Sequence, residues 1–241
     1  MQISYLKCKI SETKLFIKFV NIYLLMNKVI LGLILVNVLT SIKGFDDQAF
    51  FNKFKFQVGK ILEGEKIRML TSGFLHADWM HLGFNMYALY LFGGGVAIRF
   101  GNIKFILIYL VSLLFGSLYA LYRNNKNYYY SAIGASGAVS GIMFASILLF
   151  PGKLYSFIFF PFFSFPAYAL GIGYILYSIY GMKKQLGNVG HSAHLGGAIG
   201  GFVITLLLKP GVIHNNPKML LLLGGIILVF LLFGSKIDDK M

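Results

Sequence analysis

Seven long apolar runs, separated by short charged connections, constrain the fold of this chain more than any other feature of its sequence. Inside a bilayer every backbone N–H and C=O must be satisfied within its own segment, so such runs are expected to be helices. Barrel strands would alternate polar and apolar residues over about ten positions, whereas these runs are apolar on all sides. The runs cover residues 19–42, 79–98, 105–122, 136–150, 166–181, 192–208 and 219–234.

The composition also indicates a polytopic membrane protein. Charged residues make up 12% of the 241 residues, about half the share usual in a soluble domain. The net charge of +14 lies in the connections, where lysine and arginine attract anionic lipid. No nucleic-acid-binding motif accompanies it, so the bilayer is the expected partner and nucleic acid is not. The single cysteine, Cys8, forms neither an internal disulfide nor a zinc site.

The runs predict a core of six transmembrane helices over residues 19–208. A basic segment, 1–18, precedes it, and an extension, 209–241, adds a seventh transmembrane helix. Membrane orientation does not follow from charge, because ten lysines and arginines fall on the side of the N-terminus and twelve on the other. The long connection 43–78 mixes phenylalanine with lysine, and an interfacial segment and a solvated loop fit it about equally well.

Three polar features stand out inside the apolar runs. The one considered first is Ser136, within Gly134-Ala135-Ser136-Gly137 at the start of the fourth run. A lone serine there is more often a packing residue, because small residues line helix contacts in membranes. The run has 15 residues, which span about 22 Å at ~1.5 Å per residue, against a hydrocarbon core of about 30 Å. Ser136 is therefore expected below one membrane surface, at a helix N-terminus whose free N–H groups suit a developing oxyanion.

The second feature is His194, near the start of the sixth run. A histidine at such a place is as readily a structural hydrogen-bonding group as a base. Glycines follow both Ser136 and His194 on one helical face: Gly137, Gly141, Gly197 and Gly201. These small-residue faces allow the two helices to approach closely, as a Ser–His hydrogen bond of about 2.6–3.2 Å requires.

The third feature is the pair His81 and Asn85 in the second run, four residues apart and so on one face of a helix. Both side chains can donate hydrogen bonds to an oxyanion. A polar clasp between two helices fits this pair equally well.

Together the three features resemble the motifs of the rhomboid family of intramembrane serine proteases, over about residues 19–208. The family has GxSG at the start of the fourth core helix, HxxxN in the second and AHxxGxxxG in the sixth. This chain has GASG, HLGFN and AHLGGAIGG on those runs. The resemblance implies an all-α membrane protein with a six-helix rhomboid-like bundle. It also implies Ser136 as nucleophile, His194 as general base, and an oxyanion hole of His81, Asn85 and the Ser136 N–H, without cofactor or metal.

Other positions match the family or depart from it. His76 matches a histidine five residues before the HxxxN motif, and Arg68 matches an arginine that often follows a tryptophan, here replaced by Ile67. Some members have a tyrosine four residues after the serine, packed on the catalytic histidine, where this chain has Ser140. Residues 136–208 contain no Asp or Glu, so a dyad is expected and a group other than a carboxylate must orient the imidazole.

Three functions stay open at this stage. The favoured one is a serine endopeptidase that cleaves single-span membrane proteins through an acyl-enzyme, in the bacterial plasma membrane. The second is a non-catalytic rhomboid-like protein that binds membrane helices, although such relatives typically lack the serine or the histidine. The third is a small transporter, because polar sites at broken helices occur there too, but the sequence has no inverted repeat. The oligomeric state does not follow from the sequence.

Overall fold

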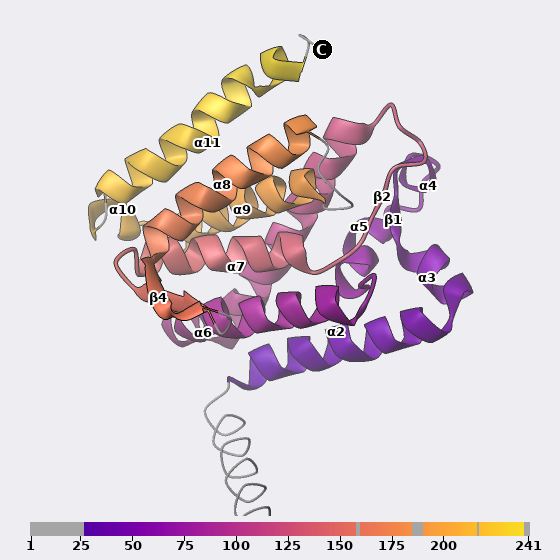
Figure 1. The fold of residues 1–241 in the computed structure, drawn as a ribbon, viewed down its shortest axis with the longest axis horizontal. Helices are drawn as coiled ribbons and strands as arrows, with labels where there is room; N and C mark the ends of the chain where they lie inside the picture. Colours follow the sequence, from indigo (N-terminus) through magenta and orange to yellow (C-terminus); the bar gives the residue numbers. More distant parts are fainter. Residues whose placement is uncertain (1–26, 158–159, 185–189, 216, 239–241) are drawn as a thin grey trace, which may run out of the picture.

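The structure is a computed structural model, and it describes residues 27–157, 160–184, 190–215 and 217–238. Residues 1–26, which hold the basic segment and the start of the first run, lie outside the described residues. The helices in Figure 1 are α2 (Lys28–Asp46), α3 (Gln48–Phe54), α4 (Val58–Leu62), α5 (Arg68–Thr71), η1 (Ser72–Phe74), α6 (Trp79–Asn124), α7 (Ser136–Leu149), α8 (Ala167–Lys184), α9 (His191–Leu208), α10 (Val212–Asn215) and α11 (Pro217–Asp238). Two antiparallel pairs join β1 (Phe56–Gln57) to β2 (Ser131–Ala132) and β3 (Leu154–Phe157) to β4 (Phe160–Pro166).

The expected all-α membrane bundle is confirmed. By length and composition α2, α6 and α9 can cross a membrane, and α7 and 217–228 of α11 are shorter apolar helices. The first run continues beyond its predicted end to Asp46, because the Lys43–Asp47 ion pair (3.1 Å) extends its last turn. Lys28 is the first residue of α2, and the Asn27 side chain caps the helix by accepting from the Val29 N–H at 2.9 Å.

The second and third runs form the two halves of α6. Gly101, with φ 75° and ψ 170°, breaks the helix between them, a conformation that glycine adopts without a steric penalty. A Cβ built on Gly93 would lie 3.3 Å from the Phe105 ring, although a straight helix would separate these residues by about 18 Å. The halves 79–100 and 102–124 therefore fold back on each other and act as two spans.

Helix α7 is the centre of the bundle. All its residues from Gly137 to Leu148 are buried, and Figure 1 shows it between α6 on one side and α8 and α9 on the other. With 14 residues it is about 21 Å long, shorter than the hydrocarbon core. Its first residue is Ser136.

The connection 43–78 is not a free loop, because it forms short helices whose side chains are partly buried. Phe56 is 2% exposed in a small cluster with Val58, Ile61 and Ala120. Arg68, also buried, clasps the connection: its Nε donates to Glu65 Oε2 at 2.7 Å, and one terminal nitrogen donates to the carbonyls of Asn52 (2.8 Å) and Lys55 (3.0 Å). Three directed hydrogen bonds from one planar guanidinium thus hold the parts of this segment together.

The C-terminal extension attaches to α8. A Cβ on Gly171 would lie 3.5 Å from the Leu223 side chain of α11, and Leu223 is fully buried. Figure 1 shows α11 running beside α8 on the outer side of the bundle.

Candidate active site

The segment before Ser136 is tied to the end of the connection 43–78. The N–H of Gly134 donates to the Ser72 carbonyl at 3.0 Å. Gly134 has φ +115°, in the left-handed region that favours glycine. Its backbone therefore turns sharply immediately before α7, so that Ser136 opens the helix without a side-chain cap. The first N–H groups of α7 are consequently free to meet an anion.

His76 is hydrogen-bonded both to this turn and to α2. Its Nε2 accepts from the Ala135 N–H at 3.4 Å, and its Nδ1 lies 2.8 Å from the Ser41 Oγ. Because Nε2 accepts, Nδ1 carries the proton and donates to Ser41, whose hydroxyl donates on to the Phe74 carbonyl at 3.1 Å. The fully buried His76 thus joins α2 to the turn before Ser136.

His81 presents a donor to the same turn. The Ala77 N–H donates to His81 Nδ1 at 3.4 Å, which assigns the proton to Nε2. A Cβ on Gly134 would lie 2.8 Å from both His81 Nε2 and Cε1, so the protonated nitrogen faces the backbone next to Ser136. Asn85 is buried one turn below and donates one amide hydrogen to the His81 carbonyl at 3.0 Å. Its second amide hydrogen is available to another acceptor.

The glycine faces of α7 and α9 meet backbone to backbone. A Cβ on Gly197 would collide with the carbonyl of Gly137, and one on Gly201 would collide with the backbone of Gly141. A Cβ on Gly137 would lie 3.3 Å from the Ala193 carbonyl oxygen. The helix that carries His194 therefore lies directly against the helix that begins with Ser136. Among the hydrogen bonds of the described residues, none joins the two side chains, and catalytic hydrogen bonds are often longer before substrate binds.

His194 is held by rings rather than by a carboxylate. The Tyr174 ring of α8 stacks on its imidazole, with centroids 5.8 Å apart and planes at 24°. His191, one helical turn earlier, lies edge-on to it at 6.0 Å and to Tyr177 at 5.1 Å. His194 Nδ1 is buried and has no hydrogen-bond partner in the part of the chain that the structure describes. Contact with aromatic rings is thus the restraint on this imidazole.

Tyr174 also reaches the serine helix. Its hydroxyl is hydrogen-bonded to Ser140 Oγ, and Ser140 Oγ donates to the Ser136 carbonyl at 2.6 Å. Since the Ser140 proton is used in that bond, Tyr174 is the donor to Ser140. The sequence did not identify Tyr174 or His191. No local signal distinguishes Tyr174 from the neighbouring tyrosines, whereas the three-residue spacing of His191 from His194 could have indicated a shared face.

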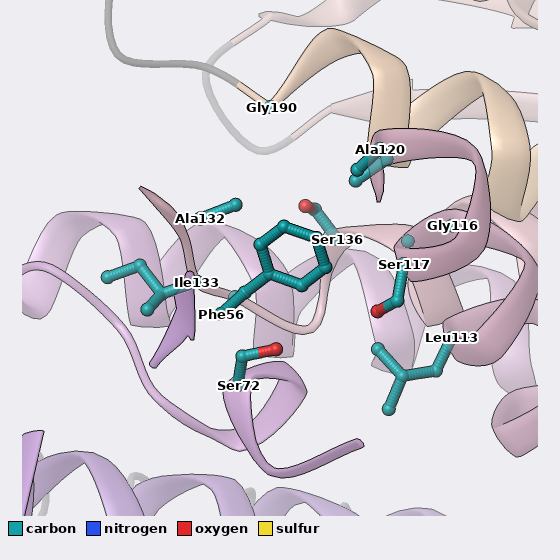
Figure 2. Close-up of a pocket in the computed structure, with 13 residues that line it drawn as sticks. Phe56, Ser72, Leu113, Gly116, Ser117, Ala120, Ala132, Ile133, Ser136 and Gly190 are labelled. Carbon is teal, nitrogen blue, oxygen red and sulfur yellow. The ribbon is translucent and has the colours of Figure 1, made fainter. Parts of the chain in front are cut away.

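A pocket opens at the serine. Figure 2 shows the Ser136 hydroxyl above the ring of Phe56 and below Gly190, which precedes α9, with Ser117 of α6 to one side. Loop, α6, α7 and the start of α9 all contribute to its lining. The Ser136 hydroxyl therefore borders a small cavity formed by the loop, α6, α7 and the start of α9.

Comparison with known proteins agrees with this arrangement. The rhomboid domain family matches residues 63–211, more than half of the chain. The chain belongs to the rhomboid family. The matched region includes the last part of the connection, with Arg68 and His76, both halves of α6, and α7 to α9. The protein is accordingly an integral membrane protein with several spans.

Three rhomboid relatives are similar to this chain over most of its length. RHOMBOID-like protein 12, mitochondrial, of Arabidopsis thaliana is 34% identical over 70% of this chain and 55% of its own length. Rhomboid protein 1, mitochondrial, of Saccharomyces cerevisiae is 29% identical over 64% of this chain and 45% of its own. Rhomboid protease GluP of Bacillus subtilis is 30% identical over 72% of this chain and 33% of its own. The chain thus spans between a third and about half of the length of these relatives.

Proposed function

We propose that this rhomboid protein is an intramembrane serine endopeptidase that uses Ser136 and His194 as a dyad. The observation that carries the proposal is the contact of α7 with α9 through Gly137 and Gly197, which brings the helix of the histidine against the helix of the serine. Two relatives from Bacillus subtilis bear the names rhomboid protease GluP and putative rhomboid protease YdcA.

The proposed reaction is acyl transfer to the serine and then to water. Ser136 Oγ attacks a peptide carbonyl carbon while His194 takes its proton. The His81 Nε2–H, the Asn85 amide and the Ser136 N–H stabilise the oxyanion. The C–N bond breaks as His194 gives the proton to the leaving amine, and water hydrolyses the resulting ester. The substrate carbonyl must be free of helical hydrogen bonds, so a transmembrane segment that unwinds near Ser136 is the proposed substrate.

Tyr174 and Ser140 have supporting roles in this proposal. Tyr174 orients the imidazole by stacking, in place of the acidic third residue of a triad. Ser140 fixes the first turn of α7 through the Ser136 carbonyl. We also propose the bacterial plasma membrane as the location, which the bacterial source of GluP and YdcA favours and the mitochondrial names of other relatives do not.

The second candidate is a rhomboid protein that binds membrane helices without cleaving them. The absence of a Ser136–His194 hydrogen bond among those of the described residues favours it, because a dyad that never closes would bind substrate without reacting. Labelling separates the two candidates, since only an activated serine reacts quickly with a fluorophosphonate.

The experiment compares purified protein with Ser136→Ala and His194→Ala, reconstituted with a single-span test substrate. Ser131→Ala and His214→Ala are matched controls, since both side chains are exposed and outside the proposed dyad. Cleavage and fluorophosphonate labelling are expected in the unchanged protein and both controls, and in neither dyad variant. Equal cleavage by all five proteins would remove Ser136 and His194 from the reaction. Folded protein without labelling would favour the binding function.

A further inference from the structure

The two ends of the bundle differ in where their carboxylates lie. One end holds the start of α7 at Ser136. The opposite end, here called the basic end, holds the Gly101 break of α6, the start of α2 and the end of α9. A hydrogen bond of 3.1 Å from Asn27 Nδ2 to Asn102 Oδ1 joins the start of α2 to the break. A Cβ on Gly95 would lie 2.9 Å from the Phe150 ring, which places the end of α7 there too.

Six cations of the described residues lie at the basic end, where no carboxylate of the described side chains accompanies them. They are Lys28, Arg99, Lys104, Lys153, Lys209 and Lys218. The carboxylates of the described side chains lie toward the serine end: Asp46, Asp47, Glu63, Glu65 and Asp78. The ion pairs among the described residues, Lys43–Asp47, Lys60–Glu63 and Arg68–Glu65, involve that acidic set alone. The positive charge at the basic end is therefore unneutralised by the described part of the chain.

Three of these cations lie close together, because α9 runs antiparallel to the second half of α6. A Cβ on Gly196 would lie 2.6 Å from Tyr119 and one on Gly200 2.6 Å from Phe115, so the end of α9 lies beside the start of that half. Arg99 and Lys104 flank the Gly101 break and are exposed, and Lys209 follows the last residue of α9. Partial burial and then the positive charges of Arg99 and Lys104 lower the pKa of Lys209. The three charges repel one another at this point, so an anion placed among them would relieve the repulsion.

The surroundings of this group are apolar. Ile98 and Ile103, which adjoin Arg99 and Lys104 in the sequence, each expose 84% of their surface. The nearby β3–β4 hairpin exposes Phe162 to 94% and Phe163 to 64%, and Lys153 lies 4.8 Å from the Tyr155 ring at its base. A free anion in water needs no such neighbours, whereas a phospholipid presents a phosphate and acyl chains together.

We propose that Arg99, Lys104 and Lys209 bind the phosphate of an anionic phospholipid, with Ile98 and Ile103 against its acyl chains. The site lies at the end of the bundle opposite Ser136 and is independent of the proposed protease activity. It would hold the turn between the two halves of α6 at the membrane surface, where the helix is broken and lacks continuous backbone hydrogen bonding.

The test uses the full chain in phosphatidylcholine bilayers with a trace of spin-labelled phosphatidylglycerol or phosphatidylcholine. The fraction of label immobilised by the protein is measured by electron paramagnetic resonance at low salt. One variant carries Arg99→Gln, Lys104→Gln and Lys209→Gln. The matched control, Lys126→Gln with Lys183→Gln and Lys184→Gln, loses the same charge from exposed lysines at the serine end. Thermal unfolding shows that both variants are folded.

We expect the unchanged protein and the control to bind phosphatidylglycerol in preference to phosphatidylcholine. The first variant should lose this preference, with the relative association constant falling roughly fivefold for each cation removed. An equal loss of this preference in both variants would mean that it depends on net charge alone, and would overturn the proposed site. No preference in the unchanged protein would overturn it as well. Displacement of the labelled lipid by inorganic phosphate at matched ionic strength would identify a free-anion site instead.

Discussion

Tyr174 of α8 stacks on His194 of α9 with ring centroids 5.8 Å apart and planes at 24°. The sequence has Ser140 where some rhomboid proteins have a tyrosine packed on this histidine, and in the structure Ser140 is hydrogen-bonded to the Tyr174 hydroxyl. A tyrosine from α8 therefore occupies the face of the imidazole that a residue of α7 leaves uncovered. As a result the proposed base depends on the position of α8.

Replacing Tyr174 by leucine is expected to lower kcat by about tenfold. The loss of the stacked ring removes an interaction worth about 0.5–1.5 kcal/mol, and each 1.36 kcal/mol in the barrier changes the rate tenfold. Tyr174→Phe keeps the ring and should retain most of the activity. Steady-state cleavage of a single-span substrate measures both, and Tyr180→Leu, at a half-exposed tyrosine of the same helix, is the control. Equal kcat for the leucine and phenylalanine variants would refute an orienting role for the ring.

His81→Ala is expected to lower kcat by about 10²–10³, with little change in KM. Its Nε2–H faces the turn at Gly134, and one lost oxyanion donor typically costs about 2.7–4 kcal/mol of transition-state stabilisation. His214→Ala, at an exposed histidine of α10, serves as control. A rise in KM at unchanged kcat would mean instead that His81 binds substrate in the ground state.

His76 is expected to make the fold sensitive to acid. Burial lowers the pKa of His76 to about 3, whereas an unfolded histidine has a pKa of about 6.5. Its neutral form therefore stabilises the fold fully above pH 6.5, and that contribution is lost as the pH falls from 6.5 toward 3. At pH 5 the loss amounts to about 2 kcal/mol. Because His81 and Asp78 lie beside it, the measurement is the difference in unfolding free energy between the unchanged protein and His76→Gln at pH 7.5 and pH 5. A difference that does not change with pH would exclude His76 as the source.

Much of the fold followed from hydropathy, because a bilayer permits few ways to satisfy the backbone. The runs became α2, both halves of α6, α7, α8, α9 and α11. The long connection 43–78 was not predictable in the same way. Its shape depends on long-range contacts, such as the bonds of Arg68 to the carbonyls of Asn52 and Lys55, which leave no periodic pattern in the sequence.

Only part of the candidate site could likewise be predicted from the sequence. Ser136, His194 and the glycines could be singled out because spacing along one helix fixes a shared face. Tyr174 could not, because its contact with His194 depends on how α8 rotates against α9. Three tyrosines of α8 lie within seven positions, at 174, 177 and 180, and nothing local decides which of them turns inward.

Gly197→Ala is expected to destabilise the protein strongly. The added methyl group would collide with the Gly137 carbonyl, and a backbone atom cannot move aside as a flexible side chain can. Overpacking of this kind costs about 1–3 kcal/mol, and the forced separation of α7 from α9 should also lower kcat by moving His194 away from Ser136. Gly173→Ala is the matched control, since a Cβ there meets no atom within 4 Å and alanine favours a helix by up to about 1 kcal/mol. Thermal unfolding in detergent should lower the midpoint for Gly197→Ala and leave it unchanged or higher for Gly173→Ala. If both variants unfold like the unchanged protein and cleave substrate at its rate, the contact of α7 with α9 is not the element that holds the dyad together.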